Sequence, residues 1–88
     1  DVGALWENYL INERMKQSYN RNRAKEFYFW RTYDNQEIDL IEESTEGLSA
    51  FEFKWGDKKT NVPTSFATAY PEASFKVINK ENYQEFVL

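Results

Sequence analysis

The chain has 88 residues, with 11 Lys and Arg against 15 Asp and Glu, and its formal net charge of −4 gives it no general attraction for nucleic acid. Cysteine and histidine are both absent, which excludes thiol nucleophiles, a Ser-His-Asp triad and the usual zinc sites. Any catalysis must therefore use carboxylates, Lys, Tyr or Ser, together with a hard metal ion.

The length predicts a single domain, residues 1–88, whose core relies on three Trp, six Tyr and seven Phe. No segment approaches the ~20 apolar residues that a membrane span needs, so we expect no membrane-spanning helix. The lack of cysteine fits a cytoplasmic protein. The chain opens at Asp1 without a methionine, and we expect it to be a fragment of a longer protein.

The first predicted element is an amphipathic helix from Val2 to about Ser18. Its apolar side chains recur at helical spacing, at positions 2, 5, 6, 9 and 10, and project to one arc of the helical wheel. Glu7 lies just beyond that arc. It could point along the sheet surface towards other carboxylates or face solvent, and the wheel alone favours solvent by about two to one.

A polar connector from Ser18 to Lys25 carries two further basic residues, Arg21 and Arg23. Basic residues interleaved with polar ones can contact phosphates. A solvated loop is the more common role of such a segment, by roughly three to one. Both alternatives leave the connector on the surface.

Glu26–Thr32 follows as a predicted strand that is so aromatic that both of its faces must be largely covered. Residues 33–36 supply a tight turn into a second strand. With the tip at residues 34 and 35, Trp30 would lie opposite Asp39 and shield one side of it. Arg31 would point to the other face, as a partner for a nearby carboxylate.

Two strand patterns, Gln36–Glu43 and Leu48–Lys54, are separated by Ser44-Thr45-Glu46-Gly47, a cluster with turn chemistry. This arrangement predicts an antiparallel hairpin whose register pairs Glu43 with Leu48, Ile41 with Ala50 and Asp39 with Glu52. Because strand side chains alternate with period 2, Lys54 falls on the same face as Glu52. Three charged groups should converge on one sheet face.

Two carboxylates on neighbouring strands repel each other and cost stability unless something positive lies between them. For Asp39 and Glu52 a divalent cation is the usual answer, and hard oxygen ligands suit Mg²⁺ or Mn²⁺. Lys54 could then stabilise negative charge or help to deprotonate a metal-bound water. The alternative is that Glu52 and Lys54 are edge-strand charges and Asp39 is solvated. The flanking Phe51, Phe53 and Trp55 weigh against an edge strand, because they indicate a central strand that is buried on its other face.

The loop after the third strand, residues 55–61, carries Lys58 and Lys59. These lysines could touch a phosphate backbone, although an exposed loop tip is the more common explanation. Asn61 is expected to cap a helix that runs from Pro63 to Tyr70.

The last predicted strand is Ser74–Asn79, which after a helical crossover should lie parallel to the third strand. Residues 82–88 should form a short terminal element that packs Phe86 and Leu88. The order helix, three-strand meander, helix, strand indicates a mixed α/β (α+β) domain with a four-stranded mixed sheet flanked by helices.

This order, with Asp39 on the second strand and Glu52-Phe53-Lys54 on the third, resembles the core of the PD-(D/E)XK, or restriction-endonuclease-like, nuclease superfamily. The resemblance implies that Asp39 and Glu52 bind metal and that Lys54 belongs to the Glu-x-Lys pair. It also implies that Glu7 is the acidic residue of the first core helix. Ile38 replaces the proline of the motif, and the glutamine that exonuclease-type relatives carry before the helical tyrosine is missing.

A closer resemblance runs along nearly the whole chain, through Gly3-Ala4-Leu5-Trp6-Glu7-Asn8-Tyr9, Phe29-Trp30-Arg31, Glu37-Ile38-Asp39-Leu40, Phe51-Glu52-Phe53-Lys54 and Tyr70-Pro71. The chain is similar to an uncharacterised C-terminal domain of prokaryotic proteins that have an N-terminal AAA+ P-loop ATPase. The resemblance implies an upstream ATPase domain as the partner within the same chain. ATP would bind in that domain, since these residues contain no Gly-x-x-x-x-Gly-Lys-Ser/Thr motif.

Three functions are consistent with the sequence. The first is a Mg²⁺-dependent phosphodiesterase acting on DNA, in which Asp39 and Glu52 hold the metal, Glu7 assists and Lys54 positions the attacking water. Arg21, Arg23, Lys58 and Lys59 would be its substrate contacts. The second is a catalytically inactive nuclease fold that binds protein or nucleic acid, which the acidic net charge favours. The third, an oligomerisation role, leaves the charged cluster unexplained. DNA versus RNA and the oligomeric state stay open.

Overall fold

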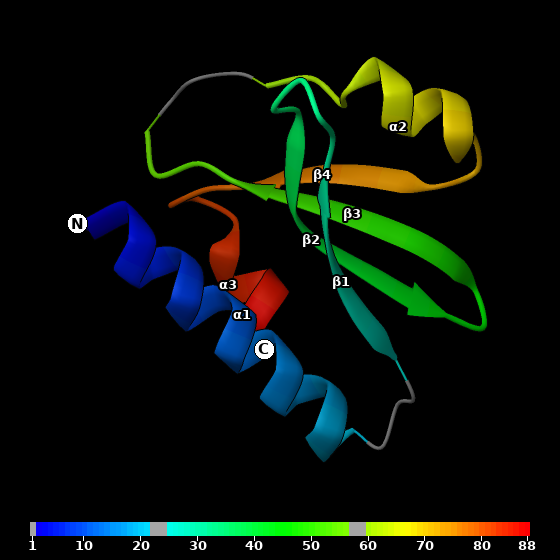
Figure 1. The fold of residues 1–88 in the computed structure, drawn as a ribbon. Coiled ribbons are helices and arrows are strands. Elements are labelled where there is room, and N and C mark those ends of the chain that lie inside the picture. The colour runs from blue at the N-terminus through cyan, green and yellow to red at the C-terminus, as the bar shows by residue number, and fades with distance from the viewer. Residues whose placement is uncertain (1, 22–24, 57–59) are drawn as a thin grey trace.

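The computed structural model describes residues 2–21, 25–56 and 60–88, and it shows a four-stranded sheet with helices on both faces (Figure 1). The elements in chain order are α1 (Val2–Asn20), β1 (Glu26–Arg31), β2 (Glu37–Ser44), β3 (Gly47–Phe53), α2 (Thr64–Ala69), β4 (Ser74–Ile78) and α3 (Tyr83–Val87). The mixed α/β class and the predicted order are confirmed, with α3 as the terminal element.

The sheet has the strand order β1-β2-β3-β4. The first three strands are antiparallel, and β4 runs parallel to β3, as the crossover rule predicts. Because β3 lies between β2 and β4, Glu52 belongs to a central strand. The alternative that Glu52 and Lys54 are edge-strand charges is therefore wrong.

Two hydrophobic cores lie on opposite faces of the sheet. The helices α1 and α3 cover one face and α2 covers the other (Figure 1). The first core joins Leu10 of α1 and Phe86 of α3 to side chains of β2, β3 and β4, and the second packs Phe66 of α2 against Ile38, Ile41 and Ala50. The prediction that both faces of the first strand are largely covered is wrong, because β1 is an edge strand in which Tyr28 is 46% and Phe29 72% exposed.

The predicted apolar arc of α1 is only partly correct. Leu10 is fully buried and Trp6 packs against the same core, but Leu5 is 71% exposed, and Val2 and Tyr9 are exposed as well. Polar side chains take the inward positions instead, because Arg14 and Gln17 donate hydrogen bonds to backbone carbonyls of the C-terminal segment. An apolar pattern cannot reveal an inward face of this kind.

A buried ion network fixes α1 to the sheet. Glu42 is only 3% exposed, and its carboxylate accepts hydrogen bonds from Arg14 Nε (2.6 Å) and Lys25 Nζ (3.1 Å). Arg14 also donates to the Phe86 carbonyl (2.8 Å), and its guanidinium lies 4.5 Å from the Phe86 ring. The predicted surface role of Lys25 is wrong, because its ammonium neutralises a buried carboxylate. The connector also begins later than predicted, since α1 continues to Asn20 and buries Ser18.

The β1–β2 register differs by one residue from the prediction. Thr32 N–H donates to the Gln36 carbonyl (2.8 Å), and Asn35 adopts φ 62°, so residues 33–35 form the turn instead of a two-residue tip. Trp30 therefore pairs with Ile38 and not with Asp39.

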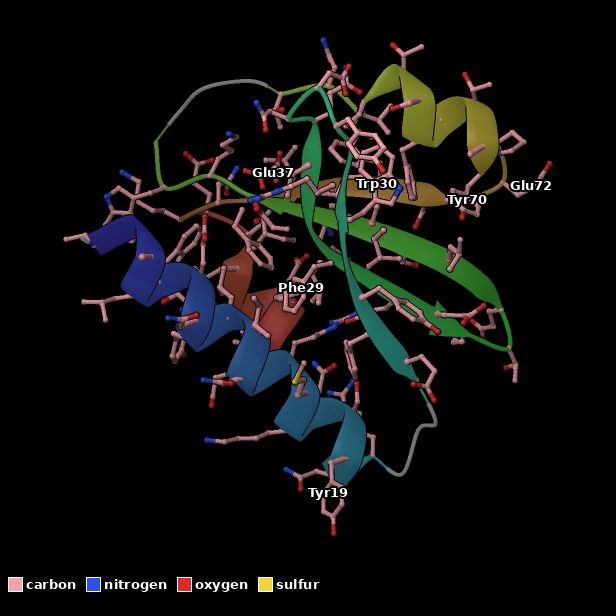
Figure 2. The ribbon with its side chains drawn as sticks, in the orientation of Figure 1. Tyr19, Phe29, Trp30, Glu37, Tyr70 and Glu72 are labelled. Atoms are coloured by element: carbon pink, nitrogen blue, oxygen red, sulfur yellow. The ribbon has the colours of Figure 1, made fainter. Side chains whose placement is uncertain are left out.

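The side chains of β1 point to alternate faces of the sheet. Trp30 is directed towards α2, and its ring contacts Phe66 with centroids 5.5 Å apart. Figure 2 shows Trp30 on the α2 side and Phe29 on the opposite side. Trp30 consequently does not shield Asp39. Arg31 pairs with the exposed Glu37 (2.7 Å), which confirms its predicted role as a carboxylate partner.

The C-terminal elements are shorter than predicted. The N-cap position of α2 is Pro63, which makes no side-chain cap bond, so the predicted cap by Asn61 is wrong. Phe86 is buried as expected, whereas Leu88 is 72% exposed, so its predicted packing is wrong. None of the described helices is both long and apolar enough to cross a membrane.

Candidate functional site

A β-bulge lies where Asp39 leaves the regular sheet. Tyr28 pairs with Ile41 and Trp30 with Ile38, so one residue of β1 faces two residues of β2, Asp39 and Leu40. In a regular strand, residues 38 and 41 would point to opposite faces, but both Ile38 and Ile41 belong to the core under α2. Bulges re-aim side chains and are common beside functional sites. Here the extra residue of β2 interrupts the regular alternation of side chains between the two faces, and Asp39 lies at this interruption.

The β2–β3 hairpin has the predicted register up to this bulge. Glu43 pairs with Leu48 and Ile41 with Ala50, as expected, and the last ladder pair is Leu40 with Phe51. The predicted Asp39–Glu52 pair thus lies one step beyond the end of the ladder.

The Asp39 side chain continues the contact between the two strands. Lys54 N–H donates to the Ile78 carbonyl of β4 (2.9 Å), so the preceding N–H, that of Phe53, points towards β2. It donates to Asp39 Oδ2 at 2.8 Å. A side-chain carboxylate therefore replaces a backbone carbonyl, and this bond fixes the orientation of Asp39.

Asp39 and Glu52 form a hydrogen-bonded carboxyl pair. The Glu52 carboxyl bonds to the Asp39 carboxylate and also to the Asp39 backbone N–H. Burial raises the pKa of Glu52, the side-chain hydrogen bond and the charge of Asp39 raise it further, and Lys54 opposes them, so that it reaches about 8. At neutral pH this raised pKa favours the protonated form of Glu52, which can donate a hydrogen bond to the Asp39 carboxylate.

Glu7 extends this cluster from α1. Burial raises the pKa of Glu7, and the charge of Asp39 raises it further, while Lys54 lowers it. Glu7 is partly buried and interacts electrostatically with these two side chains, so the wheel's preference for solvent is wrong. Sequence reasoning missed Glu37, whose charge also raises the pKa of Glu7.

The donor set fits a hard divalent cation. Mg²⁺ keeps several waters and usually takes one or two protein carboxylates, and Asp39 and Glu52 supply two that are hydrogen-bonded to each other. The described part of the chain holds no group of three or more Asp, Glu, His or Cys side chains placed to hold a metal ion. The fit rests on the carboxyl pair, and Glu7 as a further ligand stays a prediction.

The predicted substrate contacts lie elsewhere or beyond the described residues. Arg21 donates to the Leu88 backbone carbonyl, and at 1.5 Å per residue it is about 20 Å along α1 from Glu7. Arg23, Lys58 and Lys59 lie outside the described residues.

Aromatic residues to which the sequence reasoning gave no role in the site adjoin candidate site residues in the chain. Trp6 precedes Glu7 and Trp55 follows Lys54, and their rings are 5.4 Å apart at an angle of 73°. Tyr83 lies 6.3 Å from Trp6, and Lys80 Nζ lies 5.5 Å from the centroid of the Trp55 ring. The sequence signal was available, because each tryptophan adjoins a candidate site residue.

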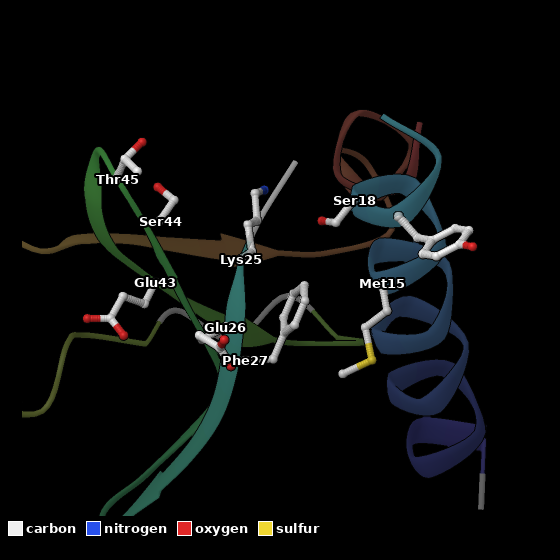
Figure 3. Close-up of a pocket in the computed structure, with 9 residues that line it drawn as sticks. Met15, Ser18, Lys25, Glu26, Phe27, Glu43, Ser44 and Thr45 are labelled. Atoms are coloured by element: carbon white, nitrogen blue, oxygen red, sulfur yellow. The ribbon is translucent and has the colours of Figure 1, made fainter. Parts of the chain in front are cut away.

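A groove of about 660 Å³ lies at the other end of α1, and it is lined by Met15, Ser18, Tyr19, Lys25, Glu26, Phe27, Glu43, Ser44 and Thr45 (Figure 3). The buried Ser18 hydroxyl makes no hydrogen bond within the described part of the chain. Carboxylates and an ammonium group line the same groove, so its charge favours no single ligand class. None of the candidate site residues contributes to it.

Comparison with models of known protein families gives a match. The family described as "Domain of unknown function (DUF4143)" matches residues 2–86, from the start of α1 to the middle of α3. No curated protein and no solved structure matches the chain. The family match covers the bulge, the carboxyl pair, all four strands and the helices up to residue 86 of α3. The chain therefore belongs to the DUF4143 family.

Proposed function

We propose that this domain is a metal-dependent phosphodiesterase of the PD-(D/E)XK type that acts on DNA. Asp39 and Glu52 hold Mg²⁺ or Mn²⁺, Lys54 acts on the attacking water and Glu7 assists from α1. The observation that carries the proposal is the carboxyl pair itself. Two hydrogen-bonded carboxyl groups on adjacent central strands, beside a lysine, form a site where a cation can replace the proton of Glu52.

Several groups of this domain can contribute to phosphodiester hydrolysis. Phe53 N–H fixes Asp39, and the bulge aims it at Glu52, so the two donors are held in place before a ligand arrives. The Lys54 ammonium can orient a water molecule and neutralise charge that develops on the phosphate. The bound metal would supply Lewis acidity and lower the pKa of its water.

The proposal also includes a partner domain and a cellular location. We infer that an upstream AAA+ ATPase domain of the same chain is the partner and that ATP binds there. A cytoplasmic location fits this assignment and the absence of cysteine.

A catalytically inactive binding module is the second candidate, and one observation favours it. The Asp39 carboxylate already accepts a hydrogen bond from Phe53 N–H and forms another with the Glu52 carboxyl. The pair is therefore satisfied as a purely structural element. The net charge of −4 also opposes avid contact with a phosphate backbone.

Cleavage assays distinguish the two candidates. The protein is incubated with plasmid DNA and with short oligonucleotides in Mg²⁺, in Mn²⁺ and in EDTA. We expect metal-dependent cleavage that is lost in Glu52→Gln and in Lys54→Met, and retained in Glu46→Gln, which changes an exposed turn residue. Absence of cleavage, both by this chain and by the longer protein, would support the inactive module. Cleavage that survives Glu52→Gln would overturn the assignment of the site.

A further inference from the structure

Trp55 is an exposed aromatic side chain that the two hydrophobic cores do not use. It is 45% exposed and belongs to neither core cluster. It follows Lys54 directly, and consecutive Cα atoms are only ~3.8 Å apart. Its indole contacts Trp6, the neighbour of Glu7, and Glu7 interacts electrostatically with Asp39 and Lys54, so the indole lies at the same end of the sheet as the carboxyl site and remains open to solvent. A side chain that only filled the core would be enclosed, as Phe66 is at 1% exposure.

Two side chains contact the indole. Trp6 of α1 meets it edge to face, with centroids 5.4 Å apart at 73°. Lys80 follows β4, and because β3 and β4 run parallel, its segment ends at the same edge of the sheet. Its ammonium lies 5.5 Å from the centre of the Trp55 ring. Lys80 is exposed, so its flexible stem can move the charge away from the ring.

We propose that Trp55 is the stacking platform for an unpaired base, so that single-stranded nucleic acid is the ligand of this site. This inference rests on the proposed function and names its substrate class. The base stacks on the indole, Lys80 moves from the ring to a neighbouring phosphate, and the adjoining phosphodiester faces Asp39 and Glu52. Stacking of this kind tolerates any sequence, because every base has a π face.

The charge of the domain favours a single strand over a duplex. Duplex DNA carries one negative charge per ~1.7 Å of helix axis, and the net charge of −4 repels it. A single strand is less densely charged and exposes the base faces that a duplex keeps stacked. Stacking therefore supplies attraction where electrostatics does not.

The test is binding in EDTA, which separates recognition from metal chemistry. Fluorescently labelled oligo(dT) and a duplex of the same length are titrated with the protein, with Trp55→Ala, with Trp55→Phe and with Tyr19→Ala. The last variant removes an exposed aromatic side chain from the far end of α1 and serves as the matched control. The midpoint of urea denaturation is measured for each variant to verify that it is folded.

We expect the protein to bind oligo(dT) more tightly than duplex. Trp55→Ala should weaken oligo(dT) binding by about 10- to 100-fold, Trp55→Phe should restore most of it, and Tyr19→Ala should leave it unchanged. Binding should also quench tryptophan fluorescence in the protein and not in Trp55→Phe, which keeps Trp6 and Trp30.

Three results would overturn the inference: unchanged affinity in a folded Trp55→Ala, equal or tighter binding of duplex, or no binding of oligo(dT). The two proposals fail separately. Trp55-dependent binding without any cleavage would refute the phosphodiesterase alone. Cleavage that is lost in Glu52→Gln and unaffected by Trp55→Ala would refute the platform alone.

Discussion

The Asp39–Glu52 pair should make the metal-free domain less stable as the pH rises. Burial, and then the bond to Asp39, raise the pKa of Glu52 from 4.5 to about 8 in the folded chain. Between pH 4.5 and about pH 8, Glu52 is protonated in the folded state and ionised in the unfolded state. The free energy of unfolding therefore falls across this window, and the stabilising contribution is complete only below pH ~4.5.

The size of the effect follows from the same two values. At 1.36 kcal/mol per pH unit, a fully enclosed group would contribute about 5 kcal/mol. Glu52 still reaches solvent, so screening reduces the expected loss to about 1–2 kcal/mol between pH 5 and pH 9. In a domain of this size that corresponds to a fall of about 5–10 °C in Tm.

Thermal unfolding followed by circular dichroism in EDTA, from pH 5 to pH 9, measures this loss. Glu52→Gln should flatten the profile and be more stable than the natural chain at pH 9, because the amide donates to Asp39 without titrating. Glu72→Gln, at an exposed position, should keep the original slope. Parallel profiles for the natural chain and Glu52→Gln, or stability that rises across the window, would refute the raised pKa of Glu52.

Substitutions at three further positions test the framework around the site. Arg14→Met removes a partner of the buried Glu42 and should cost about 3 kcal/mol of unfolding free energy in urea denaturation, with a loss below 1 kcal/mol speaking against the buried network. Phe66→Ala empties the core under α2 and should cost about 3–5 kcal/mol in the same assay, whereas a surface residue would cost almost nothing. Asp39→Asn keeps an acceptor for Phe53 N–H and should be more stable than Asp39→Ala by about 1–3 kcal/mol. Equal stability of these two variants would show that the bond contributes nothing.

The hairpin and the parallel strand could be predicted because their rules are local. Turn residues at positions 44–47 set the register that pairs Ile41 with Ala50, and period 2 then places Glu52 and Lys54 on one face. A helical crossover leaves the right-handed parallel arrangement of β3 and β4 as the default. These two rules account for the sheet order.

The bulge at Asp39 could not be predicted in the same way. It depends on a turn in which Asn35 takes a left-handed conformation, and one residue more or less in that turn shifts every pair in β1. A predicted two-residue tip therefore placed Trp30 against Asp39 and hid the irregularity. The error in the β1–β2 register did not affect the predicted proximity of Asp39 and Glu52, because that proximity depends on the β2–β3 hairpin.

The face of α1 that packs against the sheet could not be predicted from its apolar residues, because polar side chains occupy part of it. Glu42 shares a strand face with Leu40, so a buried carboxylate in need of a cation could have been inferred from alternation alone. Arg14, one helical turn after Leu10, was then the natural partner. For Glu7 the two sequence arguments disagreed. The resemblance to nucleases placed this residue near the site, whereas the helical wheel favoured a solvent-facing position.

Isothermal titration of Mn²⁺ at pH 8.5 and at pH 6 tests most directly whether Asp39 and Glu52 form one cation site. We expect saturable binding at pH 8.5, weaker binding at pH 6 where Glu52 retains its proton, and loss of binding in Glu52→Ala. Equal heats in the natural chain and in Glu52→Ala, or no binding by the folded protein at pH 8.5, would contradict the cation site.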